Sequence, residues 1–125
     1  MARYQHLPLY QFCYALTREL YRLRIKLPKT LKHDLGSTLC SSALHCLKLI
    51  IVANGQPDKE PALRSLRLEI ECLWTYSRLL YDLRGISAGE FKVLSEKLSE
   101  VASQAQAWLR WERKQKSNIV ERKTE

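Results

Sequence analysis

Residues 28–55 read PKTLKHDLGSTLCSSALHCLKLIIVANG, and this stretch decides the fold. At about 3.6 residues per turn, it predicts one helix of about seven turns that stops at Asn54-Gly55. One face repeats small and apolar residues at steps of three and four: Leu31, Leu35, Leu39, Ser42, Cys46, Leu49 and Ala53. A second apolar stripe lies roughly opposite: Cys40, Leu44, Leu47 and Ile51. Because a bundle core buries only one stripe, the second predicts contact with another subunit.

Three further amphipathic helices are predicted around this one. The first begins near Pro8 and ends before Pro28, and the third runs from about Pro61 to Arg84. The last begins at a Ser87–Glu90 capping box and reaches at least Trp111. A second apolar stripe is present on the third helix as well: Leu68, Cys72, Tyr76, Leu79 and Leu83.

The fold class follows from these lengths. Helices of about 20–25 residues joined by short links favour antiparallel neighbours. We therefore expect an all-α protein, an antiparallel up-down-up-down four-helix bundle that spans residues 1–113. The remaining residues, 114–125, have no apolar period and are expected to form a polar, disordered tail. Neighbouring subunits should meet along the second stripes.

The net charge of +8 is concentrated in parts of the chain. Residues 1–55 hold eight Lys and Arg against two acidic residues, or +6, and residues 114–125 hold four against two, or +2. The chain between them carries equal numbers of basic and acidic residues. That localisation favours an anionic partner such as nucleic acid. A merely soluble basic protein is the alternative.

Two groups of basic residues are candidates for that partner. Arg18 and Arg22 lie beside Tyr10, Tyr14 and Tyr21 on the outer side of the first helix. Rings next to guanidinium groups can stack bases and hold phosphates, or the tyrosines can pack at a subunit seam. The second group surrounds the turn at Pro28 and fits either a phosphate contact or a solvated turn: Arg24, Lys26, Lys29 and Lys32.

The residue types that carry enzyme chemistry occur in no known catalytic arrangement. The sequence has no glycine-rich phosphate loop, no His-Glu metal motif and no nucleophile elbow. We expect no enzymatic activity, no cofactor, no metal and no small-molecule substrate. The four cysteines lie on apolar helical faces and outside usual zinc spacings, which predicts reduced, packed thiols: Cys13, Cys40, Cys46 and Cys72.

Localisation is expected to be cytoplasmic, without a membrane partner. The first residues lack the apolar core of a signal peptide. No run of about 18 uncharged apolar residues occurs, because His45 and Lys48 interrupt the densest one.

The order and spacing of several segments resemble the accessory variability determinant (Avd) proteins of diversity-generating retroelements. The resemblance covers about residues 9–112. It rests on Leu27-Pro28-Lys29, Leu35-Gly36, Ala43-Leu44, the stretch from Arg78 to Arg84, and Trp108.

This resemblance implies a non-enzymatic four-helix protomer in a barrel-shaped homopentamer with a basic surface. It also implies binding to the retroelement's reverse transcriptase, and largely sequence-nonspecific binding to template RNA and cDNA in support of mutagenic retrohoming. The family's basic positions on the third helix correspond to Arg78 and Arg84. Two alternatives are an oligomeric helical adaptor that binds only protein, and a four-helix protein of the ribosomal RNA intervening-sequence type, whose role is unknown.

Overall fold

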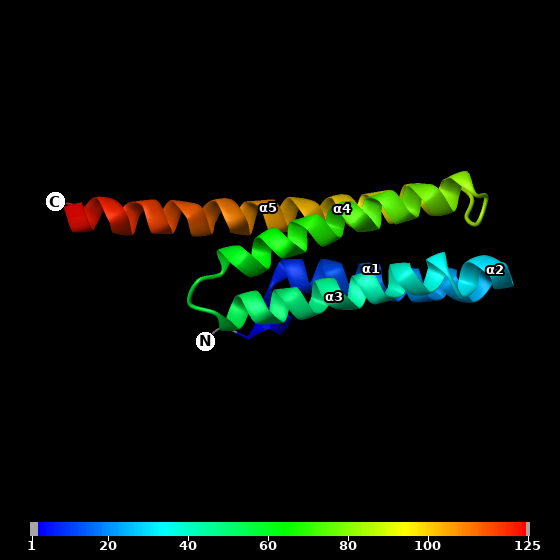
Figure 1. Cartoon of the computed structure of the whole chain (residues 1–125), viewed down its shortest axis with the longest axis horizontal. Coiled ribbons are helices and arrows are strands. Elements are labelled where there is room, and N and C mark those ends of the chain that lie inside the picture. The colour runs from blue at the N-terminus through cyan, green and yellow to red at the C-terminus, as the bar shows by residue number, and fades with distance from the viewer. Residues whose placement is uncertain (1–2, 125) are drawn as a thin grey trace.

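A computed structural model describes residues 3–124 as helices joined by short turns. A short 3-10 helix, η1 (Tyr4–His6), precedes α1 (Pro8–Lys26), α2 (Lys29–Lys32), α3 (Leu35–Gly55), α4 (Glu60–Asp82) and α5 (Ala88–Thr124). The four long helices pack in a closed order, in which α1 contacts α3, α3 contacts α4, α4 contacts α5, and α5 contacts α1. Successive helices run in opposite directions along the long axis (Figure 1). The predicted all-α arrangement of four packed helices is confirmed.

The core is built from the predicted stripes. Its largest fully buried side chains come from all four long helices, among them Leu16, Leu39, Leu66 and Leu98. Three cysteines are buried and Cys72 is half-buried, and all four are free thiols. A hydrogen bond with Cys13, together with burial, raises the pKa of the Cys46 thiol, so this thiol stays protonated inside the core.

The predicted helix of residues 28–55 is broken after its first turn. The break falls at His33 and Asp34, and Asp34 has φ −113° and ψ −94°, outside the helical region. Arg24 of α1 holds this break, because its Nε donates to the Lys32 carbonyl oxygen at 3.1 Å. Ser37 Oγ donates to the same carbonyl oxygen at 3.2 Å. A side chain from another helix therefore satisfies a carbonyl at the end of α2.

The last helix is longer than the sequence pattern predicts. Residues 114–124 continue α5, whereas we expected a disordered tail from 114 to 125. This part projects past the loop that joins α3 to α4 (Figure 1). Ion pairs stabilise its first turn, with Lys116 Nζ 2.6 Å from an Asp58 oxygen and Arg113 Nε 3.6 Å from a Glu60 oxygen. Glu125 lies outside the described residues, as do Met1 and Ala2.

One segment is long and apolar enough to cross a membrane by length and composition alone. Lys29–Gly55 reaches a mean hydropathy of 1.6 in its most apolar window, although we expected no such span. In the folded chain, α3 buries nine residues against the other helices. The bundle core accounts for part of the apolar composition of this segment, and the rest lies in the second stripe, where Leu44 and Ile51 are exposed.

Candidate nucleic-acid interface

Several predicted basic residues gather at one end of the bundle, which we call the basic end. It consists of the last turn of α1, the short helix α2 and the α4–α5 loop (Figure 1). The loop packs on α2. Gly85 of the loop lies so close to Leu31 of α2 that an added Cβ would be 3.0 Å from Leu31 Cδ1. The basic end carries Arg24, Lys26, Lys29, Lys32 and Arg84.

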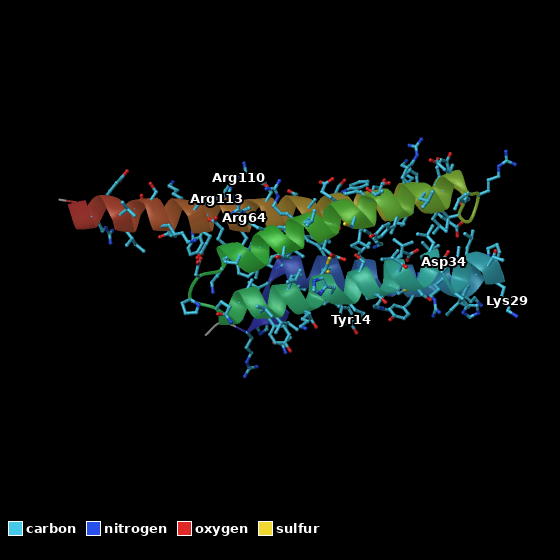
Figure 2. All side chains as sticks on the ribbon, viewed as in Figure 1. Tyr14, Lys29, Asp34, Arg64, Arg110 and Arg113 are labelled. Carbon is cyan, nitrogen blue, oxygen red and sulfur yellow. The ribbon has the colours of Figure 1, made fainter. Side chains whose placement is uncertain are left out.

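Most cations of the basic end are free of carboxylate partners. None of the ion pairs found among residues 3–124 involves Lys26, Lys29 or Lys32. Lys26 and Lys29 are exposed, and Lys32 is half-buried; Lys29 is labelled at the α2 end in Figure 2. Hydrogen bonds from Ser87, with a smaller effect from the charge of Lys26, lower the pKa of Glu90 at the start of α5. Ammonium groups that form no ion pair give this end of the bundle a positive potential.

Arg24 has a different environment from its neighbours. Its side chain is half-buried, and besides the bond to Lys32 its Nη2 donates to Ser37 Oγ at 3.0 Å. Because these bonds hold the guanidinium against the break between α2 and α3, Arg24 positions the basic end. Its guanidinium is therefore engaged within the chain, unlike the ammonium groups of the lysines around it.

Arg18 and Arg22 lie farther along the outer side of α1. Arg22 forms an exposed ion pair with Glu19, with 3.4 Å between Nη1 and Oε2. Arg18 is exposed and lines a hollow of about 430 Å³ together with Tyr10 and Tyr14. The structure thus brings Arg18 together with the tyrosines that the sequence placed beside it.

Arg78 lies on α4, away from Arg18 and Arg22 of α1, whereas Arg84 lies in the α4–α5 loop. Helix α4 lies diagonally across the bundle from α1, since each of them packs against α3 and α5. Arg78 Nε donates to Asp82 Oδ1 at 3.0 Å, and its guanidinium lies 5.9 Å from the ring centroid of Tyr81. Arg84 is exposed at the basic end and has a left-handed backbone with φ 62°.

A second basic cluster lies toward the opposite end and was missed in the sequence. Arg64, Arg110 and Arg113 are labelled together over α4 and α5 in Figure 2. Glu60 partly neutralises two of them, at 3.7 Å from Arg64 and 3.6 Å from Arg113. All three lie in residues 56–113, where basic and acidic residues are equal in number, so the charge count contains no signal for them.

The second apolar stripes lie largely on the surface of the protomer. Leu44 is 48% exposed, and the other exposed members are Ile51, Leu68, Leu79 and Leu83. Leu47, Cys72 and Tyr76 are half-buried. Cys40 differs, because it is only 4% exposed and belongs to the core. Burial raises the pKa of its thiol and the nearby charge of Arg24 opposes that shift, which places α1 over this part of α3. Cys40 therefore offers almost no surface of its own to another subunit, unlike Leu44.

The described residues offer no arrangement for a metal ion. Among residues 3–124, no group of three or more His, Cys, Asp or Glu side chains could hold one. A polar hollow of about 420 Å³ between α3 and α4 contains Ser37, Ser41 and Tyr76. Ser42 Oγ on its wall donates to Glu69 Oε1 at 2.6 Å, and this bond links the two helices.

Comparisons with protein-family models and with curated proteins find no match to this chain.

Proposed function

We propose that the protein is a non-enzymatic, oligomeric scaffold that holds RNA and cDNA beside the reverse transcriptase of a diversity-generating retroelement. The observation that carries the nucleic-acid part is the basic end, where Lys26, Lys29 and Lys32 form no ion pair with a carboxylate among the described residues. The order of segments that resembles Avd proteins supports the assignment to a retroelement. The exposed leucines of α3 and α4 support assembly into a homo-oligomer. The proposed number of five subunits comes from the resemblance to Avd proteins.

Binding would act through phosphate neutralisation. Each lysine that contacts a phosphate releases condensed counterions, so the affinity falls as the salt concentration rises. Lysines make flexible contacts with phosphates and do not by themselves read base edges. We therefore propose little sequence preference, which suits a scaffold that meets both a template RNA and its cDNA.

A salt series tests the role of the basic end. Filter binding of a structured RNA should weaken with salt for the natural protein. The Lys26→Ala/Lys29→Ala variant should lower the slope of log K against log salt by about 2, or about 1 for each phosphate that is no longer neutralised. The matched control is Lys48→Ala/Lys97→Ala, which removes the same charge from α3 and α5 away from the basic end. Its slope should stay close to that of the natural protein.

A helical adaptor that binds only protein is the second candidate, and the exposed Leu44 and Leu79 favour it. It predicts negligible RNA binding at low salt for every variant. Co-purification with a reverse transcriptase after nuclease treatment then separates the two, because the adaptor would bind the enzyme without any nucleic acid. Equal loss of RNA binding in both lysine pairs would show diffuse charge and contradict the basic end as the site.

A further inference from the structure

The outer side of α1 carries a line of aromatic rings that the basic end does not use. Tyr10, Tyr14, Arg18 and Tyr21 follow one another at steps of four, four and three, so they share one side of the helix. The opposite side of α1 is buried against α3 and α5. Tyr14 is 50% exposed and Tyr21 is 40% exposed, which is high for rings of this size. We call this line the tyrosine face.

The rings of this face are ordered relative to one another. Helix η1 folds back on α1, so that the Tyr4 ring meets the Tyr10 ring edge-on with centroids 5.2 Å apart. The centroids of Tyr10 and Tyr14 lie 6.0 Å apart, with an angle of 34° between the ring planes. Next to Tyr14, the hollow of about 430 Å³ extends over the small Ala15 to Arg18. One side of the Tyr14 ring therefore faces open space next to a cation.

Spacing and charge point to one class of occupant. The 6.0 Å between the ring centroids of Tyr10 and Tyr14 exceeds the roughly 3.4 Å between stacked bases of a duplex strand. This spacing suits an extended single strand, whose unstacked bases can lie on aromatic rings. Glu19 is the only acidic residue of α1, and it already pairs with Arg22. Ile25 continues the same side of the helix toward Lys26 at the basic end, so the two surfaces adjoin.

We propose that single-stranded nucleic acid lies along the tyrosine face, with bases stacked on Tyr10 and Tyr14 and a phosphate held by Arg18. This inference rests on the proposed nucleic-acid function and adds a contact to the bases themselves. The face from Tyr10 to Ile25 is about 22 Å long, at about 1.5 Å per residue. It would give the scaffold a preference for single strands, since the bases of a duplex are already stacked on one another.

A comparison with an abasic strand separates the contribution of base stacking from that of phosphate charge. An oligouridine of about eight nucleotides, within the usual site size of single-strand binders, is compared with the abasic sugar-phosphate strand of equal length. The natural protein should bind the oligouridine at least about fivefold more tightly, the effect of one stacked base. Tyr14→Leu should remove most of that difference, whereas Tyr14→Phe should keep it because the ring remains. Arg18→Ala should weaken both ligands by the same factor.

The possible results decide between the proposals. Equal affinity of the natural protein for the two strands would overturn stacking and leave phosphate binding in place. Failure to bind either strand at low salt would overturn the proposed nucleic-acid function itself. If Tyr14→Leu lowers the subunit number by light scattering and keeps the preference for bases, the ring lies at a protein seam and the inference is wrong. Thermal unfolding of each variant checks the fold, which should persist because Tyr14 is half exposed.

Discussion

Gly36 allows α3 to begin directly against the end of α1. A Cβ at this position would lie 2.9 Å from Leu27 Cδ1 and 3.1 Å from the Leu31 carbonyl oxygen. The leucine methyl group can move aside, but the carbonyl oxygen belongs to the backbone of α2, which the Arg24 bonds hold in place. Adding a methyl group therefore strains the turn that forms the basic end.

The Gly36→Ala variant should be less stable for this reason. We expect a loss of about 1–3 kcal/mol in the free energy of unfolding, the usual cost of overpacking. Urea denaturation measures it. Gly89→Ala is the matched control, since its Cβ would meet only Ser87 Oγ at 3.9 Å, and alanine in a helix should leave stability equal or higher. An unchanged stability for Gly36→Ala would show that α2 can shift freely.

The roles of some residues could be predicted from their spacing along a helix, and the roles of others could not. The burial of Leu9, Leu16 and Leu39 was predictable, because helical periodicity alone gives the core side of each helix. The roles of Arg24 and Cys40 were not. Each is determined by a partner from another helix, Ser37 and Lys32 for the arginine and the covering helix α1 for the cysteine. A one-dimensional pattern contains the spacing within a helix but not the neighbour across it.

At the scale of the helix, the start of α5 is fixed by a reciprocal pair of hydrogen bonds. The Ser87 amide donates to Glu90 Oε1 at 2.8 Å, and the Glu90 amide donates to Ser87 Oγ at 3.1 Å. This confirms the capping box predicted from the sequence. The bonds from Ser87 lower the pKa of the Glu90 carboxyl, so the folded state favours the ionised form.

The stabilisation that Glu90 provides should therefore depend on pH. With a folded pKa below the ordinary value of 4.5, it is fully present above pH 4.5 and is lost as the pH falls through the lowered pKa. The Glu90→Ala variant should lose about 0.5–1 kcal/mol at pH 7, and the loss should shrink in acid. Urea denaturation of the natural protein and the variant, at pH 7 and again in acid below the lowered pKa of Glu90, measures the two losses. Glu96→Ala, an exposed change on the same helix, is the control, and an equal loss at both pH values would contradict the role of the carboxylate.

Helix boundaries were predicted well where the signal is local and poorly where it is not. Pro8 at the first turn and Ser87 at the cap mark their helices directly. The break at Asp34 and the extension of α5 have no such marker. The first depends on the Arg24 guanidinium, and the second is favoured by Lys116 and Arg113 pairing with acids about 55 residues earlier. Both depend on contacts distant in sequence.

At the scale of the whole molecule, α3 and α4 each expose leucines on the surface of the protomer. Four packed helices were predictable because helical periodicity gives each helix a complete apolar stripe for the core. The same periodicity showed that α3 and α4 each carry a second apolar stripe. Their surface position is now visible at Leu44 and Ile51 of α3 and at Leu68 and Leu79 of α4. Large aliphatic side chains that share helix faces favour association with another subunit, since burial removes apolar surface from water.

The Leu44→Asp variant should separate assembly from folding. Leu44 is 48% exposed in the protomer, so a carboxylate there stays hydrated in the monomer but would lie desolvated in a subunit seam. We expect helical, cooperatively unfolding protomers that have lost self-association, measured by light scattering and circular dichroism. Ser41→Asp, an exposed change one turn earlier on α3, should leave the subunit number unchanged, and Leu39→Asp in the core should abolish folding. A natural protein that scatters light as a monomer would contradict the assembly, and the exposed stripes would then be free to receive the reverse transcriptase.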